Sequence, residues 1–163
     1  MTKEEINSDF PKPRIAWTTL SVLFLAYISS FVDRQIIGLL IEPIKKDFQI
    51  SDTEVSLLLG LSFAIFYCLV ALPIGRLVDT HSRKNIVAVG ITLWSFMTAL
   101  CGLAQNYSQL FLARIGVGVG EATLGPAAYS MLADSFPPKK LGLAMGIFNM
   151  GTCLLYTSDA ADE

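Results

Sequence analysis

The sequence predicts an all-α fold: a polytopic bundle of membrane helices with four complete transmembrane segments and a truncated fifth. Two observations predict it. Apolar residues make up 53% of the 163 residues and charged residues 16%, whereas a soluble domain carries about 25% charged residues. The apolar residues also gather in runs long enough to cross about 30 Å of hydrocarbon as helices. Membrane barrel strands would instead be about 10 residues long with strict alternation, a pattern that this sequence lacks.

The apolar runs set the expected helices, which cover about residues 15–43, 54–78, 85–104, 108–133 and 141–152. Each of the first four reaches the roughly 20 residues that a span requires. Short polar connections separate them. Ser51 and Glu54 have the spacing of a capping box, so the second helix should begin there.

Basic residues predict the orientation of these helices. On one side of the expected membrane lie Lys3, Lys12, Arg14, Arg76, Arg83, Lys84, Lys139 and Lys140, and on the other lie Lys45 and Lys46. Cytoplasmic loops carry the excess of Lys and Arg. We therefore expect residues 1–14 to form a cytoplasmic tail. That tail has no apolar core of a signal peptide, and we expect an integral protein of a bacterial plasma membrane.

The sequence favours no enzyme, metal or cofactor chemistry. The net charge of −2 suggests no nucleic-acid partner. Cys68, Cys101 and Cys153 have no metal-ligand spacing. There is no nucleophile–base set and no phosphate-binding loop after a strand. An aspartyl pair of Asp33 and Glu121 is the one enzymatic alternative, and it is less favoured than transport.

The C-terminal residues 153–163 look foreign to the rest of the chain. One choice of codons for this stretch reads as the transposon-end adapter of a sequencing library, and the match covers the whole stretch. The alternative is an ordinary polar tail. If the stretch is adapter, the natural protein continues past Thr152, and residues 15–152 are part of a longer transmembrane domain.

Charged residues inside two expected spans are the candidate functional residues. Asp33 and Arg34 lie in the first span, and Arg114 and Glu121 lie in the fourth. A charge in the hydrocarbon costs a few kcal/mol, so such residues face protein or water. They either lock helices together as a buried ion pair or form a site for substrate and protons, and we favour the second interpretation.

Helical rise predicts how these charges meet. With 1.5 Å per residue, Asp33 and Arg114 come to comparable depth on antiparallel helices, so a salt bridge between them is plausible. Glu121 falls near the midplane and is a candidate proton carrier. Gly116 and Gly120 form a small-xxx-small pair that permits close helix packing.

The junction of the second and third spans carries a family resemblance. The run from Gly75 to Lys84 resembles the cytoplasmic loop motif of the major facilitator superfamily, G-x-x-x-D-[RK]-x-G-[RK]-[RK], with matches at Gly75, Asp79, Arg83 and Lys84. Thr80 and Ser82 depart from it. The resemblance implies a twelve-helix transporter whose second half is absent from this chain. It also implies that Asp79 caps a helix of that half and helps to hold the inward-closed state.

Within that family, F-V-D-R-Q at residues 31–35 and R-I-G-V-G-V-G-E-A at residues 114–122 resemble spinster-type transporters, which are associated with lysolipids and sphingolipids. The resemblance implies that Asp33, Arg34, Arg114 and Glu121 serve proton coupling and substrate binding. The expected partners are the bilayer, protons and a lipid-like or small organic solute. An organic-anion or sugar-acid symporter, with Arg34 or Arg114 holding the anion, is the alternative. A second alternative is that this chain is an inactive truncated product.

Overall fold

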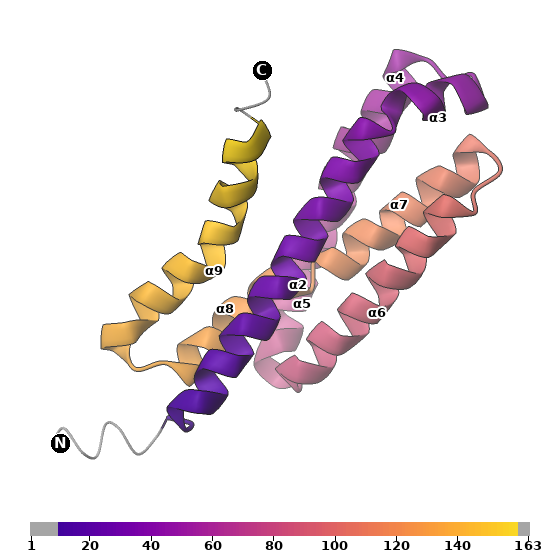
Figure 1. Ribbon diagram of the computed structural model, residues 1–163. Helices are drawn as coiled ribbons and strands as arrows, with labels where there is room; N and C mark the ends of the chain where they lie inside the picture. Colours follow the sequence, from indigo (N-terminus) through magenta and orange to yellow (C-terminus); the bar gives the residue numbers. More distant parts are fainter. Residues whose placement is uncertain (1–9, 160–163) are drawn as a thin grey trace, which may run out of the picture. The chain divides into compact units, whose positions relative to one another are not determined.

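A computed structural model describes residues 10–159, except for the side chains of residues 61, 62 and 152–159 (Figure 1). All regular elements in this part of the chain are helical, which confirms the predicted class. The chain divides into two compact units. The first comprises residues 1–31 and 128–163, and the second comprises residues 32–127.

Helix α2 (Pro13–Leu39) contributes to both units and is the first long apolar helix. Proline suits the first turn of a helix because its missing N–H would have no partner there. The carbonyl of Lys12 accepts hydrogen bonds from the amides of Ile15 and Ala16. The expected first span of residues 15–43 is therefore a helix that ends at Leu39, followed by the short helix α3 (Ile41–Phe48).

The second span begins at the predicted capping box. Ser51 Oγ accepts from the amide of Glu54, and the Glu54 carboxylate accepts from the amide of Ser51 at 2.8 Å. Three consecutive elements follow: α4 (Asp52–Ser56), the π-helical turn η1 (Leu57–Leu61) and α5 (Ser62–Thr80). The capping box satisfies two amides that a helix start leaves without partners.

Helices α6 (Arg83–Gly102) and α7 (Tyr107–Glu121) lie side by side in the second unit, joined by a short loop (Figure 1). Asn106 caps α7 by accepting a hydrogen bond from the Gln109 amide at 2.9 Å. After α7 the chain makes a tight turn, in which the Thr123 amide donates to the Gly120 carbonyl. Helix α8 (Leu124–Ser135) then begins.

This turn interrupts the expected fourth span of residues 108–133. Pro126 has no N–H to donate to the carbonyl four residues earlier, so a continuous α-helix is unfavourable there. Within the described residues, three helices are long and apolar enough to cross a membrane: Pro13–Leu39, Asp52–Thr80 and Arg83–Gly102. The interruption leaves α7 and α8 shorter than a single span.

Aromatic contacts hold the helices of the first unit together. Trp17 of α2 meets Phe136 edge-on, with ring centroids 5.3 Å apart. Phe148 of α9 (Pro138–Asp159) packs on Tyr27 at 4.8 Å between centroids. Gly151 lies so close to α2 that an added Cβ would be 3.1 Å from the Phe24 ring. The expected tail from residue 153 is helical to Asp159, and residues 160–163 lie outside the described part.

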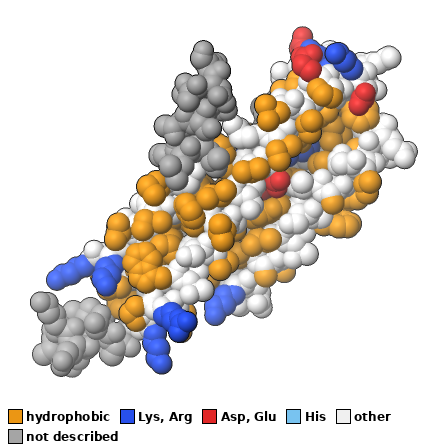
Figure 2. Space-filling model, in the orientation of Figure 1, with side chains coloured by type: hydrophobic (Ala, Val, Ile, Leu, Met, Phe, Trp, Pro, Cys, Tyr) orange, Lys and Arg blue, Asp and Glu red, His pale blue; other side chains and the backbone are white. Residues whose placement is uncertain are grey.

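Apolar side chains also cover the surface (Figure 2). Leu72 is 77% exposed, and Val89 and Leu112 are each 67% exposed. A soluble protein rarely exposes large contiguous apolar surface. These side chains suit contact with lipid.

Candidate functional site

Close packing of α6 on α7 sets the position of the candidate site. A Cβ at Gly120 would lie 2.8 Å from the Trp94 amide nitrogen and 2.9 Å from the Gly90 carbonyl oxygen. Only glycine permits this approach of two backbones. One turn earlier, Gly116 lies against the side chain of Met97. The glycines therefore fix α7 against α6, and Glu121 follows directly after Gly120.

Arg34 and Glu121 form the ion pair at the centre of the site. Arg34 Nε donates to Glu121 Oε2 at 2.8 Å, and a terminal nitrogen of Arg34 approaches the same oxygen at 2.5 Å. The Glu121 side chain is 1% exposed and that of Arg34 is 40% exposed. The carboxylate is therefore enclosed by protein, while the guanidinium also reaches the surface of the molecule. Hydrogen bonds between two charged groups are stronger than those between neutral groups.

Two aromatic rings of α5 border this ion pair. The guanidinium carbon of Arg34 lies 4.9 Å from the ring centroid of Phe63 and 5.8 Å from that of Tyr67. The two rings stack with their centroids 5.8 Å apart. Phe63 in turn lies against α7, where a Cβ at Gly118 would be 3.1 Å from the ring. The aromatic faces favour the cation electrostatically.

Arg114 is a second, more deeply buried cation beside the same ring. Its residue is 3% exposed, and its guanidinium carbon lies 5.7 Å from the Phe63 centroid. Its Nε is buried and has no hydrogen-bond partner among the described residues. An unsatisfied buried donor costs about 1–3 kcal/mol. Arg114 therefore has the capacity to bind an oxygen of a ligand.

Asp33 lies near Arg114 without pairing to it. The two charges are within electrostatic range of each other, yet they form no ion pair within 4 Å in the described part of the chain. The salt bridge expected between them is thus replaced by the pair of Arg34 and Glu121. Helical rise gives the depth of a residue in the membrane, but it does not fix which of two successive residues points at the neighbouring helix.

The four predicted charges thus gather in one region of the second unit: Arg34 with Glu121, and Arg114 with Asp33 nearby. Glu121 and Asp33 both attract Arg114 electrostatically, and Arg34 repels it. Two positive and two negative groups balance one another in this arrangement. Such a site can exchange ion-pair partners when a proton or an anionic ligand binds.

The residues of the loop motif lie at the junction of α5 and α6, apart from these charges in the sequence. Asp79 is exposed near the end of α5, Arg83 begins α6, and Lys84 is exposed. Around Gly75, an added Cβ would meet no atom within 4 Å among the described residues. The motif thus places its polar residues where two helices of the second unit meet.

Phe63 and Tyr67 are functional candidates that the sequence interpretation passed over. Both belong to the many aromatic residues of the chain, and the i, i+4 spacing places them on one face of α5. That spacing was the signal available in the sequence, and the structure adds a π-helical turn, Leu57–Leu61, directly before this part of the helix. Single π turns occur often at functional sites.

Comparison with known proteins identifies the class of the molecule. The family model of the Major Facilitator Superfamily matches residues 23–157. The chain belongs to this superfamily, which consists of membrane transporters and not of enzymes. The family predicted from the junction motif is confirmed.

Individual members of the superfamily are similar to this chain over most of its length. The chain is 35% identical over 152 residues to an MFS-type efflux pump of Mycolicibacterium smegmatis (strain ATCC 700084 / mc(2)155), a match that covers 93% of this chain and 35% of the relative. It is 32% identical over 141 residues to a probable L-galactonate transporter of Escherichia coli (strain K12), which covers 86% of this chain and 31% of that protein.

A solved structure of a bacterial homolog to the human lysosomal transporter Spinster, inward-facing and unoccupied, is similar with a TM-score of 0.83 and 38% identity. The match covers 86% of this chain and 29% of that chain. The likeness to spinster-type transporters is thus found in a structure as well as in short motifs. The chain spans about a third of the length of the relatives it matches.

Proposed function

We propose that the whole protein is a proton-coupled secondary transporter that works by alternating access between two six-helix halves. This chain would supply the first four membrane spans of one half and the beginning of the fifth, with α7 and α8 together forming the fourth span. The region of Arg34, Arg114 and Glu121 would bind the solute and the proton. The amino terminus would be cytoplasmic, in a bacterial plasma membrane, because of the distribution of basic residues.

The observation that carries this proposal is the ion pair of the buried Glu121 carboxylate with Arg34, close to Arg114, whose buried Nε has no partner among the described residues. Ionisable groups within membrane helices are costly and mark substrate paths and proton relays. If these charges only fastened the helices together, each buried guanidinium nitrogen should have a hydrogen-bond partner within the protein. Arg114 Nε therefore supports a binding role for the site.

The chemistry of this pair supports the proposed proton coupling. Protonation of Glu121 would remove its negative charge and weaken its hold on Arg34. Arg34 could then turn to an anionic group of the solute, since its side chain is 40% exposed. Asp33, within electrostatic range of Arg114, is the second carboxylate able to take part.

The solute that we propose is lipid-like or amphipathic. The likeness to a Spinster homolog supports it, as do the stacked rings of Phe63 and Tyr67 beside the guanidinium of Arg34. Aromatic rings offer apolar surface to a chain or ring of the solute, and a nearby guanidinium offers bidentate bonds to a phosphate or carboxylate.

A sugar acid is the second candidate solute. The probable L-galactonate transporter of Escherichia coli is 32% identical to this chain. Arg114, buried with a free donor, would then hold the carboxylate of the sugar acid. The two candidates make opposite demands on a binding site, because a lipid needs a lateral apolar opening and a sugar acid needs an enclosed polar pocket.

Uptake into proteoliposomes tests both proposals. The full-length protein would be reconstituted, a proton gradient imposed, and radiolabelled lysophospholipid and L-galactonate offered separately. We expect lysophospholipid uptake that collapses with the gradient and is lost in Glu121→Gln and reduced in Asp33→Asn. Uptake that is unchanged in both amide variants would refute the proton-coupling role, and uptake of L-galactonate alone would select the second solute.

A further inference from the structure

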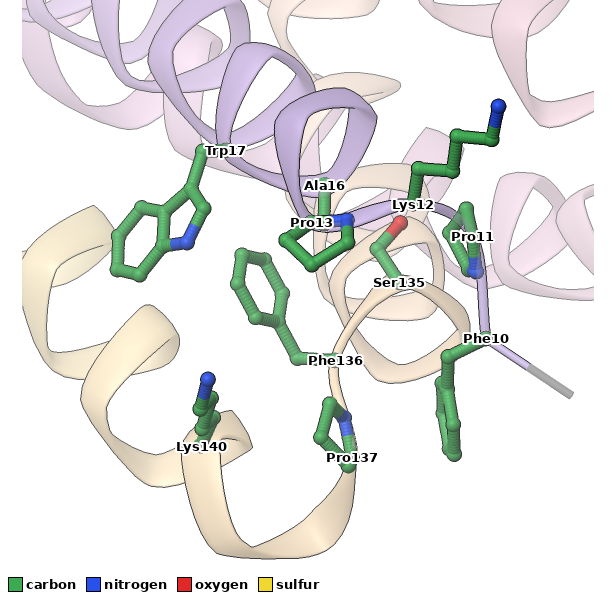
Figure 3. Close-up of a pocket in the computed structure, with 10 residues that line it drawn as sticks. All are labelled: Phe10, Pro11, Lys12, Pro13, Ala16, Trp17, Ser135, Phe136, Pro137 and Lys140. Carbon is green, nitrogen blue, oxygen red and sulfur yellow. The ribbon is translucent and has the colours of Figure 1, made fainter. Parts of the chain in front are cut away.

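A cavity of about 310 Å³ lies in the first unit, and none of the charged residues of the candidate site lines it. It is bounded by the segment that leads into α2 and by the connection between α8 and α9 (Figure 3). Small-molecule sites have volumes of about 300–1,000 Å³. This cavity is at the lower limit, so it suits a single polar group and not a whole lipid or drug-sized molecule.

Two lysines give the cavity its charge. Lys12 precedes α2 and Lys140 lies in the first turn of α9, so residues 128 positions apart in the sequence contribute to one cavity. No acidic residue lines it among the described residues. In Figure 3, the two side chains lie on opposite sides of Phe136, and Lys12 extends outward. A lysine side chain is flexible enough to fold back onto an anion.

An aromatic wall separates the lysines and gives the cavity an amphipathic character. Phe136 is 2% exposed and forms the inner surface, whereas Trp17 is 39% exposed and meets Phe136 edge-on. The indole nitrogen of Trp17 has no hydrogen-bond partner among the described residues. Tryptophan is enriched where membrane helices meet the headgroup region, since its ring has both apolar and polar parts.

We propose that this cavity binds the phosphate ester of an anionic glycerophospholipid from the adjacent leaflet. Lys12 and Lys140 would bind the phosphate oxygens, and Trp17 would donate to an oxygen of the glycerol backbone. Phe136 would contact the beginning of an acyl chain. Basic pockets between transmembrane helices bind phosphorylated lipid headgroups in this way. The site is independent of the solute that the protein carries.

The location at the first turn of a transmembrane helix is the reason to prefer a lipid over a soluble ligand. Helix α2 begins at Pro13, so the cavity lies where the candidate span Pro13–Leu39 leaves the hydrocarbon. A soluble phosphate ester shares the same chemistry and could occupy the same lysines. The experiment must therefore separate these two sources.

Native mass spectrometry of the full-length protein in detergent measures this binding directly. The protein would be titrated with phosphatidylglycerol, phosphatidylcholine and glycerol 3-phosphate in separate experiments. We expect a phosphatidylglycerol adduct whose affinity falls about fivefold in Lys12→Gln or Lys140→Gln and about thirtyfold in the double variant. Trp17→Phe, which keeps an aromatic ring but removes the indole N–H, is expected to weaken the adduct less than the double variant.

A matched double variant, Arg14→Gln with Lys139→Gln, serves as the control. Both residues are exposed neighbours of the two lysines, and neither lines the cavity. The control has the same net charge as the lysine double variant. Its affinity for phosphatidylglycerol should be close to that of the unaltered protein. Equal losses in the two double variants would overturn the proposal, because the attraction would then be general surface charge.

Binding of glycerol 3-phosphate shows whether the site takes its phosphate from a lipid or from a soluble ester. If glycerol 3-phosphate fails to bind or to displace phosphatidylglycerol, the site is a lipid site. If it binds with the same dependence on Lys12 and Lys140, the site stands and its ligand is a soluble phosphate ester. Equal binding of phosphatidylcholine and phosphatidylglycerol in the unaltered protein would contradict an anion site. Thermal unfolding of each variant checks that the exposed substitutions leave the fold intact.

Discussion

The two units of the chain deal with charge in opposite ways. In the second unit, Arg114 and Glu121 are 3% and 2% exposed and lie among helices packed through glycine. In the first unit, aromatic contacts fill the interior, and Lys12 and Lys140 are exposed at helix ends. Burying an ion is costly unless it is paired. Under the proposed function, the charges of the second unit serve binding and proton coupling, whereas those of the first unit contact water and headgroups.

The close approach of α6 and α7 gives the largest expected effect. Gly120→Ala should destabilise the protein by about 3 kcal/mol, since the new Cβ would lie 2.8 Å from the Trp94 amide nitrogen and must displace backbone. Gly116→Ala should cost less than about 1 kcal/mol, because the Cβ there meets the flexible side chain of Met97. Unfolding of the full-length protein by detergent titration measures both. Equal costs at the two glycines would show that backbone contact does not limit the packing.

Removal of the buried carboxylate should have the next largest effect. Glu121→Gln leaves Arg34 without its anion and should destabilise the protein by about 2 kcal/mol, below the range for fully buried pairs because Arg34 is 40% exposed. The control is Asp52→Asn, which breaks the surface pair with Lys45. The Asp52 side chain is 88% exposed. Surface pairs contribute little, so detergent unfolding should be unchanged in the control. A loss in the control as large as that in Glu121→Gln would break the contrast between buried and exposed pairs.

Loss of the contact between the Phe63 ring and the guanidiniums of Arg34 and Arg114 should have a smaller effect on stability. Phe63→Leu keeps an apolar side chain but removes the ring beside Arg34 and Arg114, and it should cost about 1 kcal/mol. Phe66→Leu is a matched control on the same helix, since no ring or cation contact involves Phe66 within the described part. Detergent unfolding compares the two. An equal cost would mean that the loss comes from ring volume and not from the cation.

The surface pair of Lys45 and Asp52 gives the smallest effect, a shift in titration. The hydrogen bond from Lys45 to Asp52 raises the pKa of the Lys45 ammonium above its ordinary value of 10.5. The pair therefore contributes fully below pH 10.5, and its contribution is lost as the pH rises through the raised pKa. Titration of ¹³C-methylated lysines by NMR should show that the pKa of Lys45 returns toward its ordinary value in Asp52→Asn. An unshifted titration in the unaltered protein would contradict the pair.

The sequence predicted the parts of the fold that depend on local chemistry. The class follows from the length and hydropathy of the runs, and three of the spans are long enough in the structure. The capping box at Ser51 follows from a three-residue spacing and is formed as expected. These features need no knowledge of how helices face one another.

Features that depend on tertiary contacts were beyond the sequence. Helical rise set Asp33 and Arg114 at one depth, but the rotation of α2 presents Arg34, the next residue, to Glu121. The tight turn after Glu121 was not predicted, because the apolar run of residues 108–133 is long enough to be a single span. Phe63 and Tyr67 become candidates only because the structure places the Arg34 guanidinium beside their rings.

A double-mutant cycle on Arg34 and Glu121 tests the central claim most directly. Detergent unfolding of the full-length protein would be measured for Arg34→Gln, for Glu121→Gln and for the double variant. The account predicts a coupling on the order of 1–3 kcal/mol, so that the double variant loses less stability than the two single variants together. Losses that add to within about 0.5 kcal/mol would show that these two residues do not form the ion pair on which the proposed site depends.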